Sequence, residues 1–272
     1  MRDDGMGRPS GRAEAARLQA LDLEAHLADP ALKQGFVTPM FDVIAPRYDD
    51  FTRVFSFGMD RGWKRELIGH VLRRARPNVV VLDLACGTGD LAFDIAEALP
   101  ASRVTGVDVS SGMIALANER VKRGGRVSPR DRVRFLVGDM SRIDLPDASV
   151  DVVTAGYGFR NVPDHEVALR EVARVLRPGG YLLTLDFYRP ENAFWRRLLV
   201  WYLTTAGSIV GWLWHRAPVV YAYLGPSVEH FVSWQTFSRS LDSAGFRVER
   251  VTRKLLGGIA IHIAVRVGGP AS

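Results

Sequence analysis

The chain has 272 residues with a formal net charge of +6, and 47% of them are hydrophobic and 24% charged, an ordinary globular composition that argues against global disorder. Because the basic residues are spread along the chain, no nucleic-acid partner is expected, whereas contact with an anionic membrane surface stays open. The single cysteine, Cys86, excludes an internal disulfide and a multi-cysteine zinc site, and it fits a reducing cytoplasm.

The N-terminal part differs in composition from the rest. Residues 1–10 are polar and of mixed charge with no apolar run after them, so we expect a flexible tail and no secretory signal. Residues 11–28 contain helix formers and unevenly spaced leucines, which indicates an amphipathic helix. The sequence therefore predicts a partly disordered or helical extension over residues 1–35, one α/β domain over residues 36–268 and a tail over residues 269–272.

Short apolar runs then alternate with helical stretches, the pattern of parallel strands joined by crossover helices. Before them, residues 36–76 predict helices with a loop at Ser56–Asp60. We expect strands over seven ranges, namely 79–84, 103–108, 133–138, 150–155, 180–187, 246–253 and 259–267. We expect helices over residues 89–98, 111–122, 163–176 and 234–244, with Ser110 and Asp164 as N-caps and a turn at 177–180. This pattern predicts a Rossmann-like α/β fold whose mostly parallel, seven-stranded sheet has helices on both faces.

Residues 191–232 interrupt this alternation with a segment rich in tryptophan, tyrosine and leucine. Leu198 to Trp214 contains no charge, and its length is at the lower edge of the ~17–25 residues that cross a bilayer. A crossing would separate the last strands from the rest of their sheet. We therefore expect an apolar lid or a helix pair on a membrane surface, with a homodimer interface as the alternative.

The strongest chemical signal is VVVLDLACGTGDLA at 79–92, an apolar strand that runs through a Gly-Thr-Gly turn into a helix. Glycines permit a tight turn and close approach of a ligand, while the helix N-terminus presents free N–H groups. Gly87, Gly89 and Ala92 also satisfy a loose dinucleotide fingerprint. Asp83 favours S-adenosylmethionine, because a carboxylate there can bind an ammonium group and would repel a pyrophosphate.

Acidic side chains also follow the next two predicted strands. Asp108 ends the second strand, where it can accept hydrogen bonds from both ribose hydroxyls, as NAD and S-adenosylmethionine both require. After the third strand, Asp139 can receive the adenine amino group and Met140 can cover the ring. Each residue alone is ordinary, but the series after three consecutive strands favours S-adenosylmethionine as the cofactor.

At this point the chain resembles the class I methyltransferases, and more closely the ubiquinone/menaquinone biosynthesis C-methyltransferase family, over residues 36–266. The matching segments are MFDVIAPRYDDFTRVFSFGMDRGWKREL at 40–67, VLDLACGTGDLA at 81–92, GVDVSSGMIALA at 106–117, GFRNVPDHEVALREVARVLRPGG at 158–180 and YAYLGPSVEHF at 221–231. The resemblance implies a class I methyltransferase fold that binds S-adenosylmethionine. It also implies C-methylation of a quinol ring, as in the conversion of demethylmenaquinol to menaquinol.

Carried over residue by residue, the cofactor contacts of that family fall on Thr88, Asp108, Asp139 and Met140. A further contact after the fourth strand is usually serine and here is Gly156, so a side-chain hydrogen bond is lost. The chain also has Phe51-Thr52 where the family often has Met-Asn, and Asp60 where it often has histidine. These departures leave the reaction class intact and leave the particular quinone open.

Acceptor chemistry is expected from Arg160 and Asn161, which follow the fourth strand at the edge where open α/β sheets bind ligands. In the family this pair is associated with orienting the acceptor and a water. We expect Arg160 to stabilise phenolate charge, since its guanidinium stays protonated, and Asn161 to position the oxygen or the water. We expect Tyr48 and Asp49 to close over the methionine end of the cofactor or to contact the quinol, and Tyr223 to contact the substrate.

Histidines are alternative bases because they titrate near neutrality, but His215, His230 and His262 each stand alone in the sequence. No spacing resembles a zinc site or a nucleophilic triad, so no metal is expected. Besides a quinol methyltransferase, the sequence allows a relative that acts on another lipophilic small molecule. A non-catalytic scaffold of the quinone pathway is disfavoured by the intact acidic residues. The expected partner is a lipophilic quinol, and the expected location is the cytoplasm or the inner membrane surface.

Overall fold

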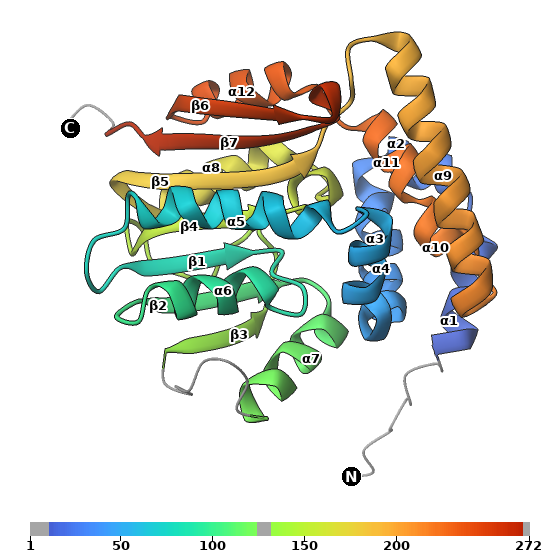
Figure 1. Ribbon diagram of the computed structural model, residues 1–272, viewed down its shortest axis with the longest axis horizontal. Helices are drawn as coiled ribbons and strands as arrows, with labels where there is room; N and C mark the ends of the chain where they lie inside the picture. Colours follow the sequence, from blue (N-terminus) through green and yellow to red (C-terminus); the bar gives the residue numbers. More distant parts are fainter. Residues whose placement is uncertain (1–10, 124–131, 269–272) are drawn as a thin grey trace.

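The computed structural model describes residues 11–123 and 132–268, and its centre is a seven-stranded sheet in the order β3-β2-β1-β4-β5-β7-β6 (Figure 1). The strands are β1 (Val80–Leu84), β2 (Arg103–Asp108), β3 (Val133–Val137), β4 (Val150–Gly156), β5 (Leu176–Phe187), β6 (Phe246–Lys254) and β7 (Ile259–Arg266). Strands β1 to β5 are parallel, while β7 runs antiparallel between β5 and β6. The predicted mostly parallel sheet is confirmed.

Helices cover both faces of this sheet because successive strand residues are apolar on both sides. Val81 of β1 packs with α5 (Met59–Leu72), α6 (Asp90–Ala98) and α7 (Ser111–Lys122), and the next residue, Leu82, packs with α8 (His165–Val175) and α12 (Trp234–Ser243). The predicted caps are confirmed, since Ser110 accepts a hydrogen bond from the backbone of Met113 and Asp164 accepts one from that of Glu166. The result is a doubly wound fold.

A third layer, made of helices, lies beyond the carboxyl ends of the parallel strands, toward which the arrows of β1 and β3 point in Figure 1. It contains α1 (Gly11–Gln19), α2 (Leu23–Ala28), α3 (Pro30–Ile44), η1 (Ala45–Arg47), α4 (Tyr48–Phe55), α9 (Ala193–His215), α10 (Val219–Ala222) and α11 (Leu224–His230). Their shared core includes Phe36 from α3, Leu199 from α9 and Tyr221 from α10. The N-terminal helices and the aromatic insertion therefore pack together into one cap over the sheet edge.

Two expected elements need correction. The single helix expected over residues 11–28 is two helices, because the Asp22 side chain accepts from the backbone of Ala25 and starts α2 anew. The turn expected at 177–180 lies within β5, where Leu176 pairs with Val150 and a register shift follows. The Pro-Gly-Gly sequence therefore forms an irregular beginning of β5.

The boundary expected between residues 35 and 36 falls inside α3, which begins at Pro30 with Asp29 as its N-cap. The division into extension and domain stays a prediction, and the tails expected at 1–10 and 269–272 lie outside the described residues.

Helix α9 shows how the aromatic insertion is held. Its buried residues are Leu199, Leu203, Gly207 and Gly211, which form one stripe at a spacing of four residues. A Cβ at Gly211 would lie 2.7 Å from the carbonyl oxygen of Ala217, and one at Gly207 would clash with that of Tyr221. These glycines let the backbone before α10 and within it pack directly on α9. In residues 11–123 and 132–268, no helix has the length and apolarity needed to cross a membrane.

Candidate active site

The glycine turn after β1 depends on backbone conformations that favour glycine. Gly87 has φ +55° and Gly89 has φ +89°, and Gly89 directly precedes α6. A Cβ at Gly89 would lie 2.6 Å from the ring of Phe135 on β3, so this position also needs glycine for packing. Gly89 accordingly packs against the sheet, whereas Gly87 lines a cleft on the other side of the turn.

On one side of this turn lies Asp83, at 1% exposure. Its Oδ1 accepts a hydrogen bond of 2.7 Å from the Thr154 hydroxyl, while Oδ2 is buried and has no partner among the described residues. Burial raises the pKa of Asp83 to about 7. An unpartnered buried carboxylate oxygen is costly, and the ammonium group of S-adenosylmethionine would satisfy it. Thr88 and Gly156 line the same small cleft.

The second part of the cleft gathers the residues expected around ribose and adenine. Asp108 accepts backbone hydrogen bonds from Gly87, at 2.9 Å, and from Ser110, at 2.8 Å. Each carboxylate oxygen keeps a further lone pair for a ribose hydroxyl. Asp139 and Met140 line the same cleft as Asp108. The predicted cofactor residues after β1, β2 and β3 thus lie around one cleft, and they fit S-adenosylmethionine.

Helix α4 closes over the glycine turn. The Thr88 hydroxyl donates to Oδ1 of Asp49 at 2.7 Å, and Arg120 donates to the Thr88 carbonyl at 2.9 Å. Tyr48 lies next to Gly87, where an added Cβ would lie 3.7 Å from its ring. Asp49 therefore contacts the cofactor loop and does not line the larger acceptor cavity. Of its two expected roles, this position favours closing over the methionine end of the cofactor. Tyr48 lines both spaces.

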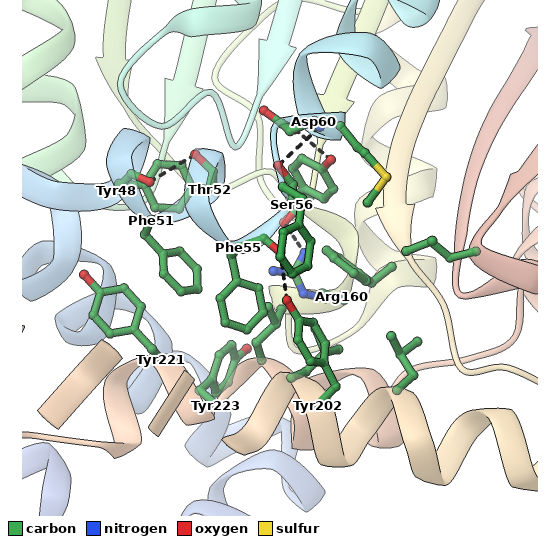
Figure 2. A pocket seen from close by; sticks show the side chains of 18 of the residues that line it. Tyr48, Phe51, Thr52, Phe55, Ser56, Asp60, Arg160, Tyr202, Tyr221 and Tyr223 are labelled. Atoms are coloured by element: carbon green, nitrogen blue, oxygen red, sulfur yellow. Dashed lines mark hydrogen bonds between the residues drawn. The ribbon is translucent and has the colours of Figure 1, made fainter. Parts of the chain in front are cut away.

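A cavity of about 380 Å³, the acceptor cavity, lies beside the cofactor cleft between α3, α4, α5 and the insertion helices (Figure 2). Figure 2 shows aromatic side chains from α4 and the insertion around it, namely Tyr48, Phe51, Phe55, Tyr202, Tyr221 and Tyr223. Among its described lining residues, Asp60 and Arg160 alone carry charge. The cavity thus combines a large apolar volume with a few polar groups at one place, as small-molecule sites commonly do.

Arg160 lies in the short helix η2 (Phe159–Asn161) and is 6% exposed. Its Nη1 donates to Oδ1 of Asp186 at 2.9 Å and to the Tyr157 carbonyl at 3.0 Å. Its Nε is buried without a partner among the described residues, and the guanidinium lies 5.4 Å from the ring centre of Phe187. The side chain is fixed in place by these contacts, and it lines the acceptor cavity with its positive charge.

Asn161 lies apart from the acceptor cavity and lines the cofactor cleft. Its amide nitrogen donates to the Tyr157 carbonyl at 2.9 Å, and its Oδ1 accepts from the Tyr223 hydroxyl at 3.0 Å. The expected Arg-Asn pair is therefore divided. Arg160 reaches the acceptor side, and Asn161 ties the turn after β4 to Tyr223, which does line the acceptor cavity as expected.

Two residues that the sequence did not single out as catalytic meet at the polar end of the cavity. The Tyr157 hydroxyl donates to Oδ1 of Asp60 at 2.8 Å, and Lys64 lies 3.0 Å from Oδ2. Tyr157 has φ +62°, a strained value for a non-glycine residue that often marks functional sites. The available signals were the place of Tyr157 between Gly156 and Gly158 and the departure of Asp60 from the family pattern.

The three histidines lie elsewhere, and none lines the acceptor cavity. His262 is buried in β7 against Tyr188, and burial lowers its pKa to about 4. His230 pairs with Glu24 at 2.7 Å, and His215 contacts the Tyr221 hydroxyl at 3.2 Å. They are packing and surface residues of this fold.

Comparison with solved structures identifies the fold. An S-adenosylmethionine-dependent methyltransferase from Aquifex aeolicus superposes with a TM-score of 0.53 at 23% sequence identity, covering 74% of this chain and 89% of that one. The sheet order and the cofactor cleft together define this chain as a class I S-adenosylmethionine-dependent methyltransferase.

Residues 30–266 match the ubiE/COQ5 methyltransferase family, and the chain belongs to that family. It is 37% identical over 227 residues to the demethylmenaquinone methyltransferase of Thermus thermophilus, covering 84% of this chain and all of that one. It is 36% identical to the ubiquinone/menaquinone biosynthesis C-methyltransferase UbiE of Geotalea daltonii, with 78% and 88% coverage. The predicted family, enzyme class and cofactor are confirmed.

Proposed function

We propose that this enzyme transfers a methyl group from S-adenosylmethionine to a ring carbon of a quinol, in particular to demethylmenaquinol. The observation that carries the proposal is the acceptor cavity, which is apolar except where Arg160 and Asp60 meet it. The activity in the name of the Thermus thermophilus relative supports the same acceptor class.

Bound S-adenosylmethionine supplies an electrophilic methyl group, and the protein residues supply position and charge. Asp83 holds the ammonium group through its unpartnered oxygen, and Asp108 holds the ribose. Tyr48 and Tyr157 line both the cofactor cleft and the acceptor cavity, so an acceptor ring between them lies next to the methionine end. Such positioning can supply much of the rate enhancement of a displacement reaction.

Arg160 activates the ring in this scheme. When a ring hydroxyl loses its proton, negative charge spreads to the neighbouring carbon and makes it nucleophilic. Arg160 lines the acceptor cavity, and its guanidinium stabilises that oxygen in a site of low dielectric. Asp186 and the Tyr157 carbonyl hold the guanidinium so that little reorganisation is needed.

The remainder of the cavity suits a hydrocarbon tail. Leu199, Tyr202 and Leu224 contribute to its lining, and each buried CH₂ of a prenyl chain stabilises the complex by ~0.8 kcal/mol. A second candidate function is methylation of another lipophilic acceptor. It is favoured because Phe51, Thr52 and Asp60, three of the four positions that depart from the family pattern, line this cavity.

We further propose that the enzyme rests on the inner membrane surface, where a prenylated quinol is found. Four exposed side chains near the cavity form an apolar rim, namely Phe57, Phe194, Trp201 and Leu256. Arg197 lies exposed on α9 between two of them and would meet anionic headgroups. Alternatively, the apolar rim is the interface of the expected homodimer.

Substitution of Arg160 tests the acceptor assignment. Arg160→Gln keeps a polar side chain but removes the charge, and we expect the rate of demethylmenaquinol methylation to fall by about 100-fold. The dissociation constant of S-adenosylmethionine should change by less than about twofold, because Arg160 does not line the cofactor cleft. Arg170→Gln, at an exposed arginine on α8, is the matched control. Full turnover in Arg160→Gln would contradict the assignment.

A further inference from the structure

A chain of three polar side chains connects the acceptor cavity with a second, polar cleft. Tyr157 lines the acceptor cavity, its hydroxyl donates to Asp60 at 2.8 Å, and Lys64 lies 3.0 Å from the other oxygen of Asp60. Asp60 and Lys64 also line a cleft of about 850 Å³ between α5 and α6, together with charged residues such as Asp94 and Glu97. These three residues thus connect the largely apolar acceptor cavity with the polar cleft between α5 and α6.

Asp60 is buried at the edge of the acceptor cavity, where Lys64 and the Tyr157 hydroxyl pair with it. It is 6% exposed, and placing an ionised carboxylate beside an apolar cavity costs free energy unless it is paired. It does not line the two parts of the cofactor cleft described above. Asp90 also lies 3.9 Å from Lys64, so Asp60 is not the sole carboxylate that neutralises the Lys64 ammonium among the described residues.

The proposed reaction needs a group that takes a proton from the ring hydroxyl. Arg160 stays protonated, and none of the three candidate histidines lines the cavity. Asp60 is the sole carboxylate among the described residues that line it. A tyrosine hydroxyl that already donates to a carboxylate can accept a second proton while it passes on its own, which makes Tyr157 a suitable relay.

We propose that Asp60 is the general base of the methyl transfer and that Tyr157 relays the proton to it. The O–H bond of the ring hydroxyl breaks, its proton binds Oη of Tyr157, and the original Tyr157 proton moves to Oδ1 of Asp60. The ring oxygen keeps the electron pair and becomes a phenolate beside Arg160. After methylation the ring carbon loses its hydrogen as a proton, so each turnover releases one net proton, which leaves through the polar cleft. This step rests on the proposed function.

The charges around Asp60 suit this role. Lys64 on α5 lies 3.0 Å from Asp60, whereas Tyr48 on α4 and Tyr157 after β4 face it as neutral phenols. Burial lowers the pKa of Lys64, but Asp60 and Asp90 outweigh this and raise it, so Lys64 stays charged. Burial raises the pKa of Tyr157 well above its ordinary value, so it transfers protons without ionising.

Single-turnover rates across pH 6–9 test the relay with demethylmenaquinol. In Asp60→Asn we expect the single-turnover rate to fall by about 100-fold at pH 7. This deficit should shrink by up to about tenfold for each unit of rising pH, because hydroxide can then ionise the ring hydroxyl. Tyr157→Phe should behave similarly. Asp60→His, which supplies another proton acceptor, should restore the rate at pH 8 to within about tenfold of the wild type. Cofactor affinity should be unchanged in the two Asp60 variants, because Asp60 does not line the cofactor cleft.

A rate in Asp60→Asn within about twofold of the wild type would overturn the relay, and so would a loss that does not depend on pH and is not rescued by Asp60→His. Binding of 1-naphthol separates this failure from that of the proposed function. The wild type should bind it as the anion below the pH at which it ionises in solution, as seen in its absorption spectrum, and Asp60→Asn should bind it neutral. Ionised naphthol without methylation of any quinol would contradict the proposed function alone.

Discussion

At the scale of single residues, Asp83 couples cofactor binding to the stability of the fold. Its carboxyl is 1% exposed, one oxygen has no partner among the described residues, and burial raises its pKa from 3.8 to about 7. The protonated form is favoured in the folded enzyme, so its contribution to stability is complete below pH 3.8 and is lost as pH rises through about 7. Above pH 7 the buried carboxylate therefore destabilises the free enzyme, and binding of the cofactor's ammonium group removes this destabilisation.

Asp83→Asn should stabilise the free enzyme while destroying its cofactor site. We expect the free energy of unfolding to rise above pH 7 by up to about 4 kcal/mol, with the difference vanishing near pH 4, because asparagine needs no proton to be neutral. Affinity for S-adenosylmethionine should fall by about 100-fold. Denaturant unfolding and calorimetry measure the two effects.

Asp242→Asn, at an exposed carboxylate on α12, is the control for that substitution. If Asp83→Asn is less stable than the wild type at pH 8, the Asp83 carboxylate does not destabilise the fold. If the variant binds the cofactor normally, Asp83 does not contact the ligand.

The residues of the site differ in how far the sequence could predict them. Asp83, Asp108 and Asp139 were predictable because each lies at or just beyond the carboxyl end of a recognisable apolar strand, and parallel strands bring these ends to one edge. Tyr157 and Asp60 meet across 97 positions of sequence, and no local pattern records such a pair. The division of Arg160 from Asn161 was equally hidden, since it depends on the conformation of one helical turn.

At the scale of elements, the seam between α9 and α10 shapes the acceptor cavity. Gly207 and Gly211 allow the backbone around Pro218 and Tyr221 to contact α9 directly, and both helices supply cavity residues. Sequence analysis predicted the apolar segment but not this contact, because glycine within a helix signals only weak helix propensity. Similarly, β5 begins at Leu176 because that residue pairs with Val150, which the local turn sequence does not reveal.

Gly207→Val should separate the helices at this seam. The added side chain would clash with the Tyr221 carbonyl, so we expect KM for the quinol to rise by about tenfold while the affinity for S-adenosylmethionine stays the same. Thr205→Val places the same side chain on the exposed face of α9 and should change neither quantity. An unchanged KM in Gly207→Val would mean that the cavity does not depend on this contact.

At the scale of the whole molecule, the acceptor cavity and the apolar rim lie where the cap meets the edge of the sheet. Phe194 is 77% exposed and Leu256 is 82% exposed, and neither lines the cavity. Exposed apolar groups of this size commonly mark interaction surfaces. The cap thus provides both the binding volume and the surface through which a membrane-borne acceptor would enter.

Vesicle flotation tests the membrane contact. The enzyme should float with vesicles that contain phosphatidylglycerol and less with neutral ones, and Phe194→Ser combined with Leu256→Ser should reduce binding by about tenfold. Leu72→Ser, at an exposed leucine at the end of α5, should have no effect. If the double variant binds vesicles normally but changes from dimer to monomer in sedimentation, the rim is an interface between copies instead.

The most direct test of the central claim is product analysis with S-adenosylmethionine that carries a deuterated methyl group. The enzyme is incubated with reduced demethylmenaquinol, other quinols and unrelated lipophilic phenols, and the products are examined by mass spectrometry. The account predicts one deuterated methyl group on a ring carbon of demethylmenaquinol. An enzyme that binds the cofactor but methylates none of the quinols, or methylates only an oxygen, would contradict it.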